Sequence, residues 1–209
     1  MSPGTGTGTP AAAYTIRATA LLTLANAKAY CGILDTTWDA VLTVIINAVS
    51  EAFNSSCGRV FAKTTYTDNY LDGNGERDLL LPHFPVIEIS ALTENEVALI
   101  QGTTADYILY SDEGRLHRLG KWYKSPKAIK LTYKAGYVAI PVDPDVENLP
   151  ADLALAIRIQ VAHEWQKMKS SAWGETARSF PDGSITYLSK KELLPEVEAV
   201  LARYRDYRF

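Results

Sequence analysis

The side chains whose chemistry could support catalysis or metal binding are few and widely separated. The three histidines, His83, His117 and His163, lie far apart, and none stands in a metal-ligand or nucleophile spacing. The two cysteines, Cys31 and Cys57, form neither a disulfide framework nor a zinc-binding spacing, so we expect buried free thiols. The sequence therefore predicts no catalytic residue, no metal site and no cofactor.

One loop gives a weak hint of a calcium site. Asp72, Asn74 and Glu76 alternate as ligands do in the first half of a calcium loop, but Arg77 occupies the position that needs glycine. Because Gly and Asn tolerate a positive φ, the Asp-Gly-Asn-Gly sequence at 72–75 is instead typical of a tight turn. We expect the tip of a β-hairpin here.

A run of basic residues is the main electrostatic feature of the chain. On a β-ribbon, such a run would attract phosphate groups or an acidic protein surface. The alternative is a solvated hairpin whose charge is balanced by acidic residues that folding brings close, for which the candidates are Asp143, Asp145, Glu147 and Asp152. The run has no acidic residue between its ends and consists of Arg115, Arg118, Lys121, Lys124, Lys127, Lys130 and Lys134.

Helical periodicity marks the segment before position 58. Thr23 can cap a short helix from Leu24 to Tyr30, which Gly32 ends. A longer helix follows and ends at Gly58, and its apolar stripe has helical spacing. The stripe contains Trp38, Val41, Leu42, Ile45, Ile46, Val49 and Phe53. A second face carries small uncharged polar residues, namely Thr43, Asn47, Ser50 and Asn54.

A second long helix begins after Pro150 and runs to about Ser170. One apolar stripe contains Leu153, Ile157, Val161, Trp165 and Met168, and another contains Leu155, Ile159 and Ala162. A helix that is apolar on more than one side usually buries more than one side. We therefore expect the first stripe to face the core and the second to face a neighbouring subunit.

Between the two long helices the apolar period changes from 3.6 to 2, which indicates a β-rich region of five or six strands. The expected strands are Thr65–Leu71, Leu79–Leu81, Val86–Leu92, Asp106–Tyr110, Arg115–Leu119 and Lys127–Ala135. The predicted fold class is α+β, with two long and two short helices around this insertion. The predicted division is a flexible arm (1–22), a helical core (23–63 and 148–172), a β-rich insertion (64–140) and a C-terminal extension (173–209). The extension is expected to be loose from Ser171 to Pro181, with a short strand at Gly183–Leu188 and a last helix at Pro195–Tyr204.

The composition is ordinary for a globular protein, with 47% hydrophobic and 22% charged residues and a net charge of -3. No uninterrupted apolar run has the length of a membrane span, and residues 1–13 lack the pattern of a signal peptide. We expect synthesis in a cytosol and no membrane partner.

Four segments in order resemble the phage head-tail connector (adaptor) family. They are LANAKAYCGILDTTWDAVLTVIINAVSEAFNSSCGR at 24–59, LLLPHFPVIEIS at 79–90, IKLTYKAGY with LPADLALAIRIQVAHEW at 129–165, and LLPEVEAVLARYR at 193–205. Lys28, Tyr30 and Gly32 match the first helix of the family, and Cys57-Gly58-Arg59 matches the end of its long helix. The chain departs from the family at Cys31, where a larger apolar residue is common, and in its N-terminal arm.

This resemblance implies a structural virion protein without catalytic activity. It implies a ring of about twelve copies at the head-tail junction, docked on the portal protein and adjoining a tail, stopper or tail-terminator protein. Double-stranded DNA would pass through the ring without sequence-specific contacts, and assembly would take place in the host cytoplasm. The small polar stripe would then suit either close helix packing or a channel wall, and the basic run would dock partners. The C-terminal tail would dock on the portal through Arg203, Tyr204, Arg205, Tyr207, Arg208 and Phe209.

The main alternative is a monomeric β-rich module that binds nucleic acid or a glycan through the basic run. A hydrolase ranks third, since no nucleophile and base or paired carboxylates can be argued. The connector interpretation predicts assembly with a portal, whereas the binding-module interpretation predicts a persistent monomer.

Overall fold

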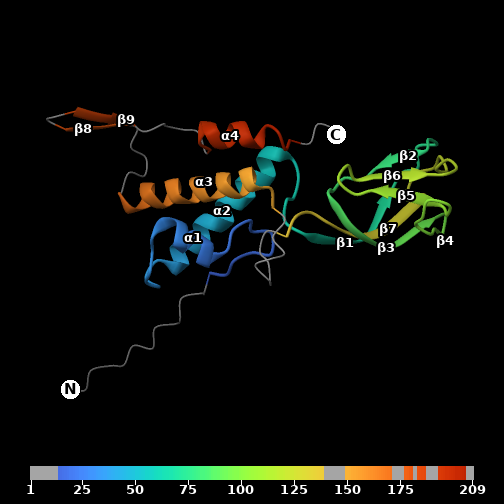
Figure 1. The fold of residues 1–209 in the computed structure, drawn as a ribbon, viewed down its shortest axis with the longest axis horizontal. Helices are drawn as coiled ribbons and strands as arrows, with labels where there is room; N and C mark the ends of the chain where they lie inside the picture. The colour runs from blue at the N-terminus through green and yellow to red at the C-terminus, as the bar shows by residue number, and fades with distance from the viewer. Residues whose placement is uncertain (1–13, 139–148, 171–176, 181–182, 187–192, 206–209) are drawn as a thin grey trace, which may run out of the picture.

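The computed structural model describes residues 14–138, 149–170, 177–180, 183–186 and 193–205. The helices gather at one end of the molecule and the two larger sheets at the other (Figure 1). The helices are α1 (Leu24–Cys31), α2 (Asp39–Cys57), α3 (Ala151–Lys169) and α4 (Pro195–Leu201). Four described helices and antiparallel sheets of four and three strands confirm the α+β class.

The ends of α1 and α2 follow from local sequence chemistry. The Thr23 side chain accepts a hydrogen bond from the Asn26 amide and caps α1. Gly32 and Gly58, with φ of 68° and 67°, end α1 and α2 in the left-handed conformation that glycine adopts at low cost. The predicted boundaries of both helices are confirmed to within about two residues.

The helical core forms where α3 lies across α2, with α1 and α4 on either side (Figure 1). The apolar stripe of α2 supplies Leu42, Ile46 and Phe53, and that of α3 supplies Leu153 and Ile157, all fully buried. Trp38 packs edge-on against Trp165 at one end of this core, with ring centroids 5.1 Å apart. Of the described helices, α2 alone has the length and composition of a membrane span, and its apolar stripe is the centre of this core.

The β-rich half contains two antiparallel sheets. One has the order β1 (Thr64–Leu71), β7 (Ile129–Ala135), β3 (Val86–Glu94), β4 (Val97–Ala98), and the other has β2 (Asp78–Leu80), β6 (Arg115–Arg118), β5 (Tyr107–Tyr110). Their buried faces share a second core that includes Leu116, Trp122, Leu131 and Tyr133. All six expected strands are present, and the two-residue β4 is an addition.

The predicted hairpin at 72–75 is wrong. β1 pairs with β7 and β2 pairs with β6, so residues 72–77 cross from one sheet to the other. The Gly73 amide donates to Ser125 O, and a Cβ on Gly73 would lie 1.8 Å from Tyr123 O. Glycine is therefore required here for close backbone packing.

The C-terminal extension differs from expectation in its strands and in its last helix. β8 (Ala177–Phe180) pairs with β9 (Gly183–Thr186), so the segment expected to be loose includes a strand. α4 ends at Leu201, and the next residues form a turn in which the Arg203 amide donates to Val200 O.

The two halves meet around Arg59, which follows α2 and is only 7% exposed. Its guanidinium carbon lies 3.8 Å from the ring centroid of Phe84 and 5.1 Å from that of Phe61. The guanidinium also donates to Phe84 O. A residue of the helical half is therefore enclosed by aromatic side chains from both halves.

Candidate assembly surfaces

The small polar stripe of α2 fastens residues 15–21 to the helix. Asn47 accepts a hydrogen bond from the Arg17 amide and donates to Thr15 O, both at 3.0 Å. Ser50 Oγ accepts from the Leu21 amide at 3.0 Å and donates to Ile46 O at 2.7 Å. These side chains satisfy backbone groups of a segment that has no regular structure of its own.

The channel-wall interpretation of this stripe is wrong for three of its four members. Thr43, Ser50 and Asn54 are 3%, 2% and 8% exposed, and Asn54 accepts from the Phe61 amide. Side chains enclosed by their own subunit have no surface to offer a channel. The positions of these three side chains agree with the other interpretation of the stripe, close packing within the subunit. Asn47 is the one member of the stripe that is partly exposed.

The second apolar stripe of α3 lies on an open face of the subunit. Leu155 is 49% exposed, and Ile159 and Ala162 are partly exposed. Ile159 also packs at the margin of the helical core. The face is thus available to a neighbour within the described part of the chain, as the sequence interpretation requires.

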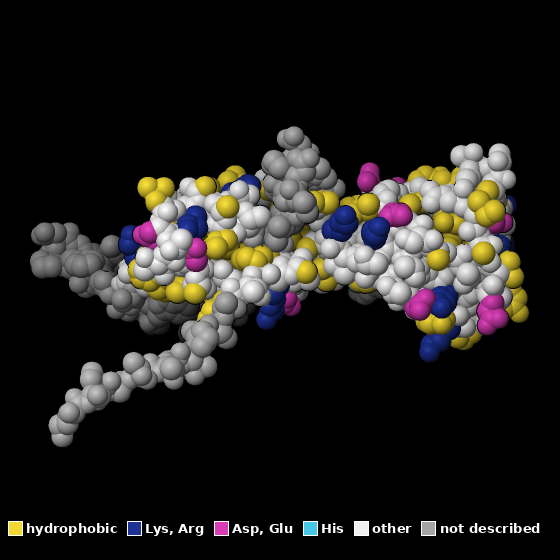
Figure 2. Space-filling view, turned by 90° about the horizontal axis from the view of Figure 1, so that it is seen from below, with side chains coloured by type: hydrophobic (Ala, Val, Ile, Leu, Met, Phe, Trp, Pro, Cys, Tyr) yellow, Lys and Arg dark blue, Asp and Glu magenta, His cyan; other side chains and the backbone are white. Residues whose placement is uncertain are grey.

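The basic run divides into paired and unpaired cations. Arg115 pairs with Asp78 and Glu113, Arg118 with Glu94, Lys130 with Asp68, and Lys134 with Glu88, at N–O distances of 2.7–3.1 Å. The hydrogen bond from Lys134 lowers the pKa of Glu88. Acidic and basic side chains accordingly lie side by side on the face of the β-rich half seen in Figure 2. The charge of these four cations is therefore largely balanced.

Of the four carboxylates expected to balance the run, only Asp152 lies within the described residues. Asp143, Asp145 and Glu147 lie outside the described residues, and Asp152 pairs with Arg203 at 3.3 Å. The carboxylates that do the balancing come from other strands and turns of the β-rich half.

Three lysines of the run, Lys121, Lys124 and Lys127, are exposed and make no ion pair within the described residues. Their loop is anchored by its backbone, since Trp122 N donates to Glu76 O and Lys127 N to Asp72 Oδ1. These hydrogen bonds therefore hold the loop that carries the three lysines in place.

The C-terminal tail is partly attached to its own subunit. The Tyr204 hydroxyl donates to Asp152 Oδ1 at 2.5 Å, and its ring packs edge-on against Phe61. Tyr204 is therefore attached to the fold of its own subunit. Arg203 and Arg205 are exposed, whereas Tyr207, Arg208 and Phe209 lie outside the described residues.

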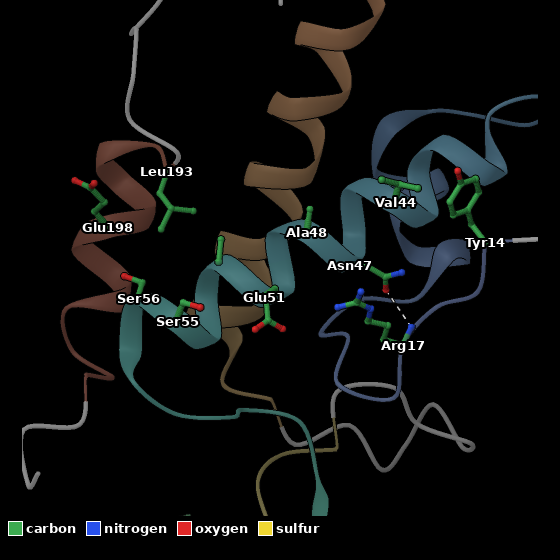
Figure 3. A pocket seen from close by; sticks show the side chains of 11 residues that line it. Tyr14, Arg17, Val44, Asn47, Ala48, Glu51, Ser55, Ser56, Leu193 and Glu198 are labelled. Carbon is green, nitrogen blue, oxygen red and sulfur yellow. Dashed lines mark hydrogen bonds between the residues drawn. The ribbon is translucent and has the colours of Figure 1, made fainter.

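A groove along α2 was not predicted from the sequence. Its cavity is about 920 Å³, and Val44, Ala48 and Glu51 of α2 lie between α4 and Tyr14 (Figure 3). A hollow of about 390 Å³ beside it shares Val44, Ala48 and Ala52 and reaches Glu164 of α3. The spacing of 44, 48 and 52 was the signal in the sequence, but small residues at helical spacing do not by themselves distinguish a core from a surface.

Among the described residues, Cys57, His117 and His83 each have a different setting. Burial raises the pKa of the Cys57 thiol to about 11, so this buried side chain is a protonated thiol at neutral pH. His117 contacts Asp78 and His83 stacks on Tyr66, in two separate places. Within the described ranges, no three His, Cys, Asp or Glu side chains come together as a metal site.

Comparison with solved structures finds the same fold in particle necks. A chain from the neck of an empty gene transfer agent (GTA) particle, computed with C6 symmetry, matches with a TM-score of 0.54, 19% identity and coverage of 93% of this chain and 94% of that chain. A chain of the native GTA virion matches with a TM-score of 0.53 and 20% identity, over 93% of this chain and 94% of that chain. A chain from the native GTA neck, computed with C12 symmetry, matches with a TM-score of 0.51 and 20% identity, over 93% of both chains. No curated protein sequence matches the chain.

The sequence comparison with protein families covers both halves of the fold. The model of the family described as "Head completion protein" matches residues 20–207. That span includes every described helix and strand. The protein therefore belongs to the head completion protein family.

Proposed function

We propose that the protein is a structural subunit of the head-tail junction, where it joins the capsid to the tail. The observation that carries this proposal is the family match over residues 20–207, which spans both the helical and the β-rich half. The similar fold of GTA neck chains over 93% of this chain supports the same location. The protein would assemble in the host cytoplasm and remain in the virion.

The subunits would form a closed ring below the portal protein, with DNA passing through its centre. We propose twelve copies, by analogy with the GTA neck computed with C12 symmetry. DNA passage requires no sequence readout, which agrees with the absence of a DNA-recognition motif from the sequence. A stopper or tail-terminator protein would occupy the opposite side of the ring.

Two surfaces would contact the partners of the ring. The loop with Lys121, Lys124 and Lys127 offers positive charge to an acidic partner surface. The tail from Arg205 onward would dock on the portal. Tyr204 would act as the anchor at which the docking segment leaves the subunit.

The experiment is imaging of the purified protein mixed with its cognate portal by negative-stain electron microscopy. Rings stacked on the portal are the expected result. Imaging of particles that lack the protein should show filled heads without attached tails. The proposal is wrong if the protein ignores the portal and particles without it join heads to tails normally.

A further inference from the structure

We propose that the groove along α2 receives the exposed ridge of α3 from the next copy of the chain in the ring. The ridge consists of Leu155, Ile159 and Ala162. This inference rests on the proposed function, because it assigns the subunit interface of the proposed ring. The contact would use two different surfaces, one on each side of the helical half, and the occupant of the groove would be a second copy of the protein.

The shape of the groove is suited to binding a helix. Its floor is the exposed side of α2, where Val44 is 44% exposed and Ala48 and Ala52 have small side chains. Leu193 beside α4 borders both hollows, and Tyr14 borders the other end (Figure 3). Small residues on the floor allow a second helix axis to approach to about 8 Å, the short end of the usual range.

The ridge has the complementary form. Leu155, Ile159 and Ala162 follow one another at intervals of four and three residues, so they make one narrow stripe along α3. Leu155 projects most, with 49% of its surface exposed. Large apolar side chains of a ridge can fill the space above the small residues of a groove.

The groove and the ridge lie on opposite sides of the helical half. Glu164 of α3 borders the smaller hollow beside α2. It follows Leu155 by nine positions, which at about 100° per residue places it about 180° around the helix from Leu155. The ridge therefore faces away from the groove of its own subunit and can only enter that of another copy.

Cyclic rings require this kind of arrangement. In a ring of more than two subunits, each subunit contacts its two neighbours through two different surfaces. A symmetric dimer, by contrast, uses one self-complementary surface twice. This chain presents two unlike apolar helical faces in the described residues, one concave and one convex, and a head-to-tail contact covers both in every subunit.

Charged residues lie at the margins of both faces. Glu51, Glu198 and Arg17 line the groove, Lys167 borders the smaller hollow, and Glu51 is exposed. The stripe of the ridge continues through Gln166 to the exposed Lys169 in the last turn of α3, and Arg158 lies beside it. Where Glu51 or Glu198 meets the basic side chains of the next copy, opposite charges favour this partner and its register. Residues 1–13 of the same chain contain no charged side chain and cannot form such pairs.

Cysteine cross-linking in assembled particles tests the contact. Ala48→Cys and Ile159→Cys are combined in one chain, and the particles are treated with a mild oxidant. We expect a ladder of disulfide-linked multimers on a non-reducing gel, and none beyond the wild-type background from either single variant. A matched control combines Ala48→Cys with Leu34→Cys, because Leu34 is 99% exposed on the loop between α1 and α2. Dimers from a single variant would indicate a symmetric contact and overturn the proposal.

Cryo-electron microscopy of wild-type particle necks tests the same contact without a substitution. The expected map places α3 of one subunit over Ala48 of the next. A ring in which the groove is empty, or is filled by residues 1–13, overturns this inference and leaves the proposed function intact. A neck from which the protein is absent refutes the proposed function itself.

Discussion

The guanidinium of Arg59 lies over the ring of Phe84, with 3.8 Å between the guanidinium carbon and the ring centroid. Arg59 belongs to the segment that leaves α2, and Phe84 precedes β3, so this contact joins the helical half to the β-rich half. A cation stacked on an aromatic ring away from water is stabilised by about 2 kcal/mol or more. The contact therefore fixes the junction at which the two cores of the protein meet.

Arg59→Ala should lower the free energy of unfolding by roughly 2–4 kcal/mol, because both the ring contact and the hydrogen bond to Phe84 O are lost. Arg59→Lys should recover only part of this, since an ammonium group cannot stack as a planar guanidinium does. Urea denaturation measures both changes. The control is Arg77→Ala, an exposed arginine whose loss should change stability by less than about 0.5 kcal/mol. Equal effects of the two alanine variants would contradict the assigned role.

Gly73→Ala should destabilise the β-rich half by about 3 kcal/mol or more, because the new Cβ would lie 1.8 Å from Tyr123 O and the backbone would have to move. Gly120→Ala is the matched control in the same half. A Cβ at Gly120 has no atom within 4 Å, and its φ is outside the left-handed region. Thermal unfolding of the two variants should differ clearly. A Gly73→Ala protein as stable as the Gly120→Ala protein would show that the two segments do not pack this closely.

The helices could be predicted from the sequence because their signals are local. The cap at Thr23, the stop at Gly58 and the stripe of α2 each depend on residues a few positions apart. Strand pairing could not be predicted in the same way. β1 lies next to β7 about sixty positions further along, and nothing in the sequence at 72–75 distinguishes a hairpin from a crossing between sheets.

The candidate surfaces show the same division. The sequence identified the ridge around Leu155 and the basic run, because periodicity and charge are visible in it. It did not reveal that Ser50 is buried by the segment before α1, or that Glu88 neutralises Lys134. Burial and ion pairing depend on which distant segments meet, and polarity alone does not encode them.

Ser50→Ala should lower the free energy of unfolding by about 1–3 kcal/mol, because it leaves the buried Leu21 amide without its acceptor. Amide hydrogen exchange at Leu21 should also become faster, which locates the defect. Ser55→Ala on the exposed side of α2 is the control and should be neutral or slightly stabilising, since alanine favours helix. An unchanged exchange rate at Leu21 would mean that Ser50 does not hold this segment.

Tyr204→Phe should cost about 1 kcal/mol of stability at pH 7, and the cost should shrink in acid. The hydrogen bond from Tyr204 lowers the pKa of Asp152 in the folded protein. A lowered folded-state pKa contributes stability above the unfolded value, about 3.9, and this contribution is lost as the pH falls through the folded-state pKa. Denaturation of both proteins from pH 7 to pH 2 measures the difference. A difference that stays constant over this range would exclude ionised Asp152 as the acceptor.

Deletion of residues 206–209 should weaken portal binding without changing the free energy of unfolding, whereas deletion of 203–209 should change both. The longer deletion removes Tyr204, whose hydroxyl bonds Asp152 and whose ring packs against Phe61. It would therefore confuse a folding defect with a docking defect. The shorter deletion leaves this anchor in place and removes Tyr207, Arg208 and Phe209, the side chains proposed to dock. Portal pull-down and urea denaturation on the same preparations separate the two effects. Full portal binding by the shorter deletion would refute the docking role of the tail, because the subunit that binds would still be correctly folded.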